Sequence, residues 1–295
     1  MNETTITAGQ AWLPFTPRGV AAFAAAPLRR LLLVELVVAA FSAAIPAWFI
    51  HANWFSVVRE AVARLPEGAA IRHGLLQWPT NTPVRLAENP WLGLVVDAKG
   101  VGGQGRTADV EVTLQEKQIK VASLLGFIRL SYPQGRSISL SRADVIPWWG
   151  AWETPILAMF MAAEIALLMA IWLTLATFYT PLALAFGFYA NRRLGWRSGW
   201  KLCGAALMPG ALVAVAGVFC YGWLGMDLLR LGMFFLLHFL AGWIYLAASP
   251  YFLPRDPRAP MPLANPFAPP TDDKTASPKP EPENPFAGPS PDLEE

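Results

Sequence analysis

Four long apolar runs constrain this chain more than any other feature of its sequence. They cover residues 31–50, 156–177, 202–224 and 231–248. A helix needs about 20 apolar residues to cross the hydrocarbon core of a bilayer, and inside lipid it satisfies its backbone polar groups internally. The sequence therefore predicts an α-helical integral membrane protein with about four transmembrane helices.

Composition agrees with a membrane protein and argues against other classes. Hydrophobic residues make up 54% of the chain and charged residues 15%, whereas a soluble domain carries about 25% charged residues. The formal net charge of +2 is too small to indicate a nucleic-acid partner, so none is expected. Both cysteines, Cys203 and Cys220, lie in the third apolar run, which leaves segment 51–151 without a disulfide framework.

The basic residues predict which side of the membrane each segment occupies, because lysine and arginine collect in cytoplasmic loops. They precede the first run, separate the second from the third, and follow the fourth: Arg18, Arg29, Arg30, Arg192, Arg193, Arg197, Lys201, Arg255 and Arg258. We therefore expect a cytoplasmic N-terminal segment 1–30, an extracytoplasmic domain 51–151 and a cytoplasmic C-terminus, in a bacterial inner membrane. The transmembrane helices are expected at 31–50, 152–179, 202–224 and 228–249.

Two parts of this scheme leave alternatives open. Apolar character continues over 156–190, and a single helix of that length would be about 50 Å long, against a hydrocarbon core of about 30 Å. We expect one span followed by a basic interfacial or projecting helix over 180–201; the alternative is two spans with a turn near Thr180 and Pro181. The first run is expected to be an uncleaved anchor, and a secretory signal is the alternative.

The segment 51–151 is predicted to be a small β-rich domain, entered through a helix over 53–63. Val110, Val112 and Leu114 alternate with polar residues, which is typical of a strand with one wet face. Glu116 and Lys117 are expected to form a hairpin turn. Short β-prone runs separated by turn residues occupy 71–78, 84–87, 92–97, 109–115, 118–123, 127–131 and 137–140.

One glycine-rich stretch matches a known motif by spacing alone. Gly100, Gly102 and Gly105 have the spacing of a dinucleotide fingerprint, but that motif needs a helix N-terminus after it to receive the phosphate. A strand is expected to follow here, so we interpret the stretch as a flexible hairpin loop. Tryptophans bracket the expected outer boundary of the membrane, as an aromatic belt does: Trp48, Trp54, Trp148, Trp149 and Trp152.

Three ionisable residues, Glu35, Glu164 and His238, lie within the apolar runs. A charged side chain at the centre of a membrane helix costs at least about 2.5–3.5 kcal/mol, so each is expected to face protein. Glu35 is expected to be an interfacial carboxylate paired with Arg29 or Arg30. The depths of Glu164 and His238 are compatible with a contact, either as a packing hydrogen bond, which we expect, or as a proton relay.

The remaining motifs favour packing over chemistry. Ala206, Gly210, Ala214 and Gly217 form a stripe of small residues that lets another helix approach closely. The sequence contains no recognisable enzyme motif, and His51 and His73 lack partners at metal-ligand spacing. We therefore expect no catalytic residue, no metal and no cofactor.

The C-terminal tail, 250–295, is predicted to be disordered and cytoplasmic. From Pro254 onward it holds 13 of the chain's 27 prolines, and such a composition cannot bury enough apolar surface to fold. Asn-Pro-Phe-Ala occurs twice in it, and each copy offers a turn with one apolar anchor. The docking candidates for a cytoplasmic protein are Asn265, Pro266, Phe267, Asn284, Pro285 and Phe286; low-complexity drift is the alternative.

Several motifs of the outer segment resemble a known family. Ile71-Arg72-His73-Gly74-Leu75, the prolines Pro79 and Pro83, the stretch from Leu94 to Gly100, and Val112-Thr113-Leu114 are similar to the run of strands in the bacterial membrane family of domain of unknown function 1189. The resemblance covers about 15–249 and implies one span, an outer domain and a cluster of further spans. It implies no activity.

These observations predict a non-enzymatic inner-membrane protein. Its outer domain is expected to sense or bind an envelope component or to act as a scaffold, and its tail to dock a cytoplasmic protein. Besides these two, the bilayer is the expected partner. The alternative is a small transporter or transporter subunit that uses Glu164 and His238.

Overall fold

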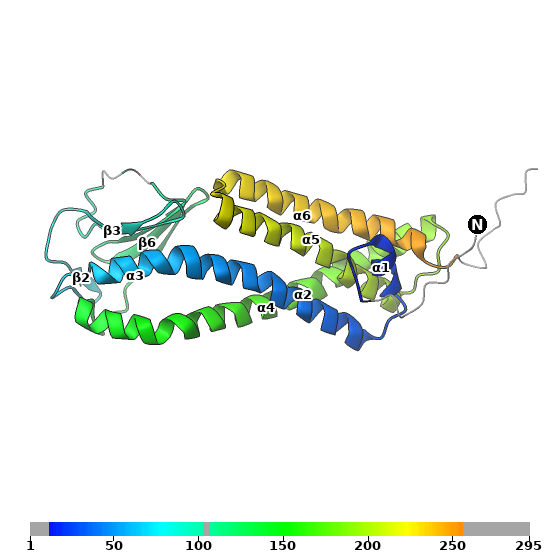
Figure 1. The fold of residues 1–295 in the computed structure, drawn as a ribbon, viewed down its shortest axis with the longest axis horizontal. Helices are drawn as coiled ribbons and strands as arrows, with labels where there is room; N and C mark the ends of the chain where they lie inside the picture. Colours follow the sequence, from blue (N-terminus) through cyan, green and yellow to red (C-terminus); the bar gives the residue numbers. More distant parts are fainter. Residues whose placement is uncertain (1–11, 103–104, 106, 256–295) are drawn as a thin grey trace, which may run out of the picture. The chain divides into compact units, whose positions relative to one another are not determined.

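The computed structural model describes residues 12–102, 105 and 107–255. This part of the chain is mostly helical, with a small β region (Figure 1). Four helices are long and apolar enough to cross a membrane, as predicted. They are α2 (Leu28–Phe49) with its continuation, α4 (Arg142–Tyr189), α5 (Trp196–Leu224) and α6 (Leu228–Ala248).

The first of these helices carries the chain directly into the β region. After α2 the chain forms one π-helical segment, η2 (Ile50–Trp54), and then α3 (Phe55–Ala63). The helix expected over 53–63 is therefore present and is joined to α2. Val57 and Ala61 of α3 are buried against Leu86, Leu92 and Val96 of the β region. The core of the β region is therefore built on the extension of a candidate membrane helix.

A three-stranded sheet has the order β2-β1-β8, with β1 (Ala70–Arg72), β2 (Leu75–Gln77) and β8 (Ser137–Ser139). The single strand expected over 71–78 is instead a hairpin, because His73 and Gly74 form its turn. Both have positive φ angles, 53° and 76°, a left-handed conformation that glycine adopts without steric cost. Alternation of apolar residues does not reveal such a turn.

A five-stranded sheet contains β3 (Val84–Glu88), β4 (Leu92–Val96), β5 (Val110–Leu114), β6 (Gln118–Ser123) and β7 (Gly126–Ser131), in that order. The β5–β6 hairpin turn at Glu116 and Lys117 is as predicted, closed by a 2.9 Å hydrogen bond from the Gln115 amide to the Gln118 carbonyl. Strands β4 and β5 are parallel. The glycine-rich stretch between them is therefore a crossover connection, and the expectation of a hairpin loop was wrong.

The helix α4 is continuous over 48 residues. The expected separate helix over 180–201 is not present: 180–189 extend α4, and α5 begins at Trp196. A turn at Thr180 and Pro181, which two spans would need, is also absent from this described helix. Helices in membranes tolerate interior prolines when neighbouring groups satisfy the freed carbonyls, so Pro181 gave a misleading boundary.

The first turns of α4 lie beside α3. The Glu153 carboxylate is 3.9 Å from the Arg59 guanidinium and 3.7 Å from His51 Nε2. The ring of Trp149 lies edge-on to Phe55 at 5.1 Å. These contacts tie the start of α4 to the α2–α3 helix.

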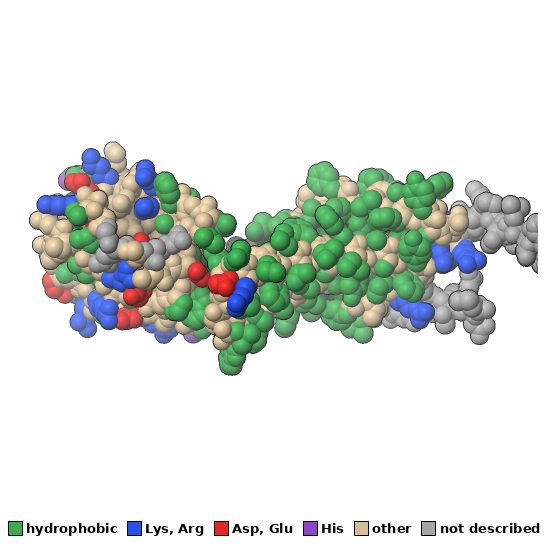
Figure 2. Space-filling model, turned by 90° about the horizontal axis from the view of Figure 1, so that it is seen from above, with side chains coloured by type: hydrophobic (Ala, Val, Ile, Leu, Met, Phe, Trp, Pro, Cys, Tyr) green, Lys and Arg blue, Asp and Glu red, His purple; other side chains and the backbone are tan. Residues whose placement is uncertain are grey.

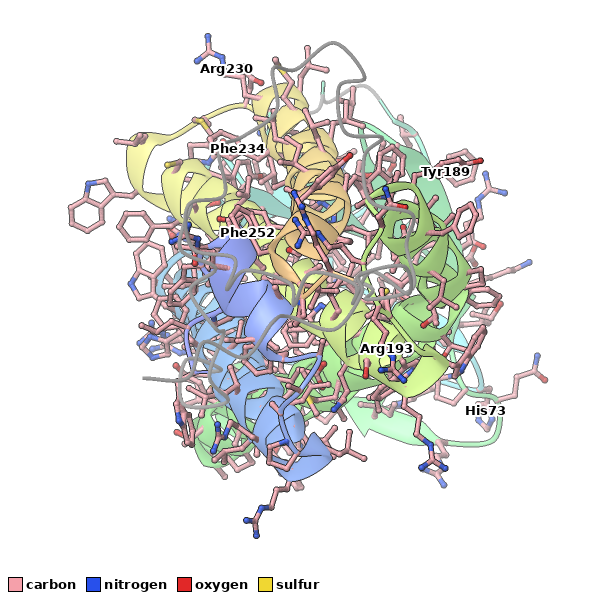
Figure 3. All side chains as sticks on the ribbon, turned by 90° about the vertical axis from the view of Figure 1, so that its right-hand side faces the viewer. His73, Tyr189, Arg193, Arg230, Phe234 and Phe252 are labelled. Carbon is pink, nitrogen blue, oxygen red and sulfur yellow. The ribbon has the colours of Figure 1, made fainter. Side chains whose placement is uncertain are left out.

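The helix α5 packs against α2, α4 and α6. A Cβ atom added at Gly210 would lie 2.5 Å from the His238 carbonyl oxygen of α6, and one added at Gly217 would lie 2.5 Å from Phe234 Cβ. The close approach predicted from the small residues is therefore confirmed, and its partner is α6. Arg230, at the start of α6, does not take part in this contact and projects outward from the bundle (Figure 3).

Apolar side chains cover the outer surface of the helices. Figure 2 shows hydrophobic side chains over the helical region, while charged side chains gather on the β region and at the opposite end. Exposed examples on α4 and α6 are Leu167, Phe178, Leu236, Leu240 and Ile244. Such a surface is unfavourable in water and is compatible with a membrane protein.

The segments before α2 and after α6 meet at the end of the bundle away from the β region (Figure 1). They include α1 (Pro17–Ala22) and η3 (Ser249–Phe252). The Arg18 guanidinium lies 5.4 Å from the centre of the Phe252 ring, and the Tyr245 hydroxyl donates a 2.6 Å hydrogen bond to the Phe15 carbonyl. Arg192, in the α4–α5 connection, donates to the Leu253 carbonyl. The basic connection thus lies at the same end as both segments.

Candidate functional site: a buried carboxyl and an aromatic junction

Glu35 is a fully buried acidic side chain of the described bundle. It lies on the face of α2 that packs against α5, and its exposed fraction is 0%. Neither carboxyl oxygen has a hydrogen-bond partner among the described residues. The expected pairing with Arg29 or Arg30 is therefore absent. Arg30 instead stacks on the Trp12 ring, 4.9 Å from its centre, because Glu35 lies more than one helical turn deeper in α2.

A glycine on α5 makes room for this carboxyl group. A Cβ atom added at Gly204 would lie 2.6 Å from Glu35 Oε1 and 3.5 Å from a methyl carbon of Leu31. Leu31 and Cys203, on either side of this contact, are fully buried. Burying a polar group without a hydrogen bond costs about 1–3 kcal/mol, so this position is energetically expensive within an otherwise apolar contact.

A second polar group lies on the same face of α2. Ser42, seven residues after Glu35, is buried, and its hydroxyl also lacks a partner among the described residues. Residues seven apart lie on one face of a helix. The surface of α2 toward α5 therefore carries two polar groups in an apolar setting.

Glu164 and His238 have separate surroundings. Glu164 on α4 is half-buried, and its Oε2 atom has no described partner. His238 on α6 is half-buried, with its Nδ1 atom against the Phe235 carbonyl and its ring 3.9 Å from that of Phe239. No hydrogen bond or ion pair joins Glu164 to His238 in the described structure. Equal depth on two helices does not make two side chains face each other.

The other end of the bundle meets the β region through aromatic rings. Phe49, at the end of α2, has three aromatic neighbours: Tyr221 of α5 at 5.3 Å, Trp91 before β4 at 5.9 Å, and Trp54 of η2 at 6.2 Å. Trp91 and Tyr221 are themselves 6.3 Å apart. Aromatic pairs in this range contribute about 0.5–1.5 kcal/mol each beyond their burial. We call Phe49, Trp54, Trp91 and Tyr221 the aromatic junction.

One hydrogen bond fixes the aromatic junction to the sheet. The Tyr221 hydroxyl donates to the Asp109 carboxylate at 2.6 Å. Asp109 immediately precedes β5, and its amide donates to the Pro90 carbonyl at 2.9 Å. Because β4 and β5 are parallel, Trp91 and Asp109 lie at the same end of the sheet. That end therefore rests on α2 and α5.

Sequence reasoning did not identify the aromatic junction. Tyr221 and Asp109 are 112 residues apart, and no spacing rule connects a helix end to the start of a strand at that distance. Nothing in the sequence singled out Trp91 or Tyr221. The parallel pairing of β4 with β5 brings them together, and that pairing was not predicted.

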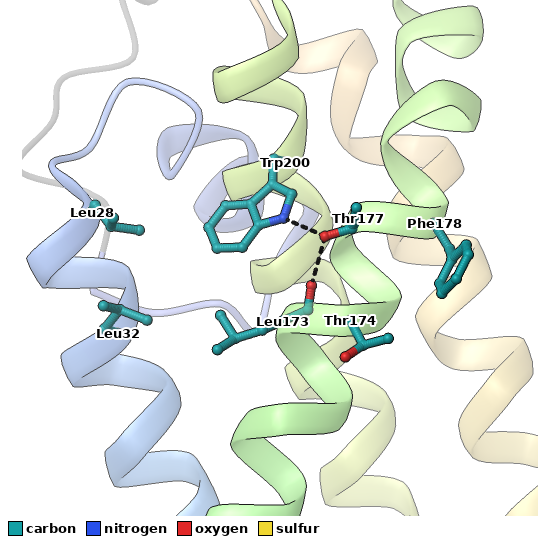
Figure 4. A pocket seen from close by; sticks show the side chains of 7 residues that line it. All are labelled: Leu28, Leu32, Leu173, Thr174, Thr177, Phe178 and Trp200. Carbon is teal, nitrogen blue, oxygen red and sulfur yellow. Dashed lines mark hydrogen bonds between the residues drawn. The ribbon is translucent and has the colours of Figure 1, made fainter.

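A groove lies between α2, α4 and α5, near the basic end of the bundle (Figure 4). Its volume is about 620 Å³. Trp200 donates a 3.0 Å hydrogen bond from its indole nitrogen to the Thr177 hydroxyl, which donates in turn to the Leu173 carbonyl. The lining is mostly apolar: Leu28, Leu32, Leu173, Thr174, Thr177, Phe178 and Trp200. It contains none of the ionisable residues singled out from the sequence.

Two further sequence predictions concern the docking residues of the tail and metal binding. Asn265, Pro266, Phe267, Asn284, Pro285 and Phe286 lie outside the described residues. Within 12–102, 105 and 107–255, histidine, cysteine and acidic side chains form no group of three or more that could hold a metal ion.

Comparison with known proteins identifies no relative. No family model, no curated protein and no solved structure matches the chain. The resemblance to the family of domain of unknown function 1189 therefore stays a prediction, and a function has to be argued from the residues.

Proposed function

We propose that this chain is a non-enzymatic, multi-pass protein of the bacterial inner membrane, with the β region outside the cytoplasm and both termini inside. In this proposal the β region binds an envelope component and the helical bundle registers whether it is bound. The observation that carries the proposal is the hydrogen bond between Tyr221 and Asp109 within the aromatic junction. It connects the sheet to α5 directly, while α3 connects the sheet to α2.

The contacts favour a relay over a simple anchor. A domain held only as cargo needs one flexible linker, whereas this β region is joined to the bundle through a continuous helix, a ring cluster and a charge-assisted hydrogen bond. A displacement of β5 would act on α5, which further along its length packs Gly204 against Glu35 of α2. Coupling of this kind needs an element with two arrangements that both sites bias, and we assign that role to the contact between α2 and α5.

The native cysteine beside the aromatic junction provides a test. Cys220 is adjacent to Tyr221 and half-buried, whereas Cys203 is buried. Tyr221→Phe and Asp109→Asn should each increase the rate at which maleimide labels Cys220, and the double variant should label no faster than either. Tyr179→Phe, which removes a hydroxyl that accepts from Trp243, is the matched control. Unchanged labelling in both junction variants would contradict a coupled junction.

Ligand binding itself needs an experiment in cells. Crosslinking followed by purification of the full chain should recover an envelope component bound through the β region, and the Tyr221→Phe variant should retain it. Recovery of no envelope component under conditions that trap the protein intact would leave a scaffold as the better proposal.

The tail is proposed to dock a cytoplasmic protein through its two Asn-Pro-Phe-Ala copies. Two weak sites on one chain raise avidity by about 10²–10⁴ when a partner engages both. Truncation after Leu253 should abolish capture of that partner, and Phe267→Ala with Phe286→Ala should do the same, while either substitution alone weakens capture less. A double variant that retains every partner lost on truncation would identify the repeat as low complexity.

Transport is the alternative suggested by Glu164 and His238, and no described hydrogen bond or ion pair between these two residues adds support for it. Glu164→Gln should cost about 1 kcal/mol or less and leave function intact. Proton-coupled flux in liposomes that this substitution abolishes would make transport the better proposal.

A further inference from the structure

The β6–β7 hairpin exposes a cluster of large apolar side chains. Leu125 in its turn is 92% exposed, Leu124 beside it 59% and Phe127 in β7 58%. All six residues of β7 are exposed, and this strand is an edge of the five-stranded sheet. Contiguous exposed apolar residues of this kind mark contact sites for membranes or proteins.

The register of the sheet fixes which way this turn points. Ser123 of β6 lies opposite Val110 of β5, and Asp109, just before Val110, accepts the hydrogen bond from Tyr221. Leu124 and Leu125 extend the chain beyond Ser123, and a strand advances about 3.3 Å per residue. The hairpin turn therefore lies at the bundle-facing end of the sheet, at or beyond the level of Asp109.

That level coincides with the aromatic end of the helices. Tyr221 is one turn from the end of α5. On the same stretch of α5, Phe219 and Trp223 stack at 5.9 Å, and Trp48 of α2 lies 5.6 Å from Phe219. Clusters of tryptophan at helix ends occupy the headgroup region of a bilayer. The hairpin turn thus lies beside the boundary that these rings mark.

On the face of the hairpin that carries Phe127, the side chains change from apolar to cationic with distance from the turn, while Ile128 and Leu130 are exposed on the other face of β7. The turn is apolar, and Phe127 follows it. Further from the turn lie Lys120 and Arg129, opposite each other, with Lys120 Nζ 5.3 Å and Arg129 Cζ 4.9 Å from the centre of the Phe127 ring. Apolar, then aromatic, then cationic is the sequence of a surface that enters an interface and meets lipid phosphates.

We propose that the β6–β7 hairpin is a second membrane contact, in which Leu124 and Leu125 enter the headgroup region of the outer leaflet and Lys120 and Arg129 bind lipid phosphates. The partner is a phospholipid surface. This inference rests on the proposed placement of α5 across the membrane. It gives the β region a contact with the membrane independent of the aromatic junction.

Depth-dependent fluorescence quenching tests the contact. Single cysteines at Leu125, Glu116 and Leu167, in a Cys203→Ala and Cys220→Ala background, are labelled with an environment-sensitive fluorophore. The full chain is placed in nanodiscs of phosphatidylglycerol and phosphatidylcholine, one protein per disc, with brominated acyl chains as quenchers. Glu116 lies in the β5–β6 turn at the opposite end of the sheet, and Leu167 is exposed in the middle of α4.

Quenching at Leu125 and Leu167, with none at Glu116, supports the hairpin contact. Quenching at Leu167 alone overturns it while leaving the membrane placement intact. Absence of quenching at Leu167 overturns the placement and the hairpin contact with it. A shielded but unquenched label at Leu125, together with disulfide-linked dimers of the Leu125→Cys protein in liposomes, would assign the surface to a second copy of the chain and overturn the lipid contact.

Substitution of the two basic residues, Lys120 and Arg129, tests the phosphate contact independently. Lys120→Gln with Arg129→Gln should reduce quenching at Leu125 in discs containing phosphatidylglycerol and leave quenching at Leu167 unchanged. Arg136→Gln, a basic residue beyond β7, is the matched control. Equal quenching in the double variant and the control would overturn the phosphate contact.

Discussion

The carboxyl group of Glu35 lies among apolar side chains, with no described protein partner for either oxygen. Gly204 makes room for it, since a Cβ atom there would lie only 2.6 Å from Oε1. Nothing in the apolar run around residue 35 distinguishes this face of α2 from the others. The free-energy cost of burying a side chain such as Glu35 therefore depends on which residue of the neighbouring helix lies opposite it.

Replacing this carboxyl group should stabilise the protein. Glu35→Met keeps the length of the side chain and removes a polar group buried without a hydrogen bond, a gain of about 1–3 kcal/mol. Thermal unfolding in detergent should show a higher Tm. Glu164→Gln, at a half-buried position, is the control and should change little. A lower Tm for Glu35→Met would mean that the carboxyl group is stabilised by a bound water or ion.

Tyr132 makes the β region sensitive to alkali. It is buried in the core, donates a 3.0 Å hydrogen bond to the Gln115 carbonyl, and burial raises its pKa from 10.0 to about 12. Because the pKa of Tyr132 is higher in the folded protein than in the unfolded chain, its contribution to stability is fully present below pH 10. That contribution is lost as the pH rises from 10 through 12.

Tyr132→Phe should therefore lose less stability than the native chain between pH 10 and pH 12. It removes one hydrogen bond, worth about 1 kcal/mol at neutral pH. Thermal unfolding of the full chain across the window measures the slope. Tyr189→Phe is the control, because Tyr189 is exposed and projects away from the bundle (Figure 3). Equal slopes for the two variants would refute the assignment.

At the scale of elements, the contact between α5 and α6 depends on glycine. The backbones approach so closely at Gly210 that a methyl group would meet the His238 carbonyl oxygen. Backbone atoms cannot rotate away as the end of a side chain can, so the two helices would have to separate.

Gly210→Ala should destabilise the bundle by about 1–3 kcal/mol through overpacking. The matched control is Gly232→Ala in α6, where an added Cβ meets nothing within 4 Å. Since alanine is favoured over glycine in a helix by about 1 kcal/mol, the control should be neutral or stabilising. Thermal unfolding in detergent compares the two, and equal Tm values would contradict the close packing.

At the scale of the whole molecule, the four candidate spans return the chain to the end where it entered. The proposed topology predicts that a cysteine at Ser137 is labelled by an impermeant reagent outside intact cells, whereas one at Ser277 is labelled only after permeabilisation. Both are made in a background without Cys203 and Cys220. External labelling at Ser277 would overturn the arrangement with both termini inside.

Features that depend on the local order of residues could be predicted before the structure was known. Hydrophobic run length predicted the four long helices, and alternation with turn residues located most strands, because both signals are periodic along the chain. Two predictions from the sequence that were wrong each have a physical reason. Pro181 suggested a boundary that α4 passes through, and the turn at His73 and Gly74 depends on left-handed backbone angles that apolar patterning does not report.

Contacts between distant residues could not be predicted in this way. Glu35 faces Gly204, His238 contacts the Phe235 carbonyl of its own helix, and Tyr221 reaches Asp109 because two strands pair in parallel. These are contacts between elements far apart in the chain, fixed by the rotation of helices about their axes and by sheet order. Neither quantity is encoded in the length or period of a run, so the aromatic junction and the surroundings of the buried carboxyl became visible only in the folded chain.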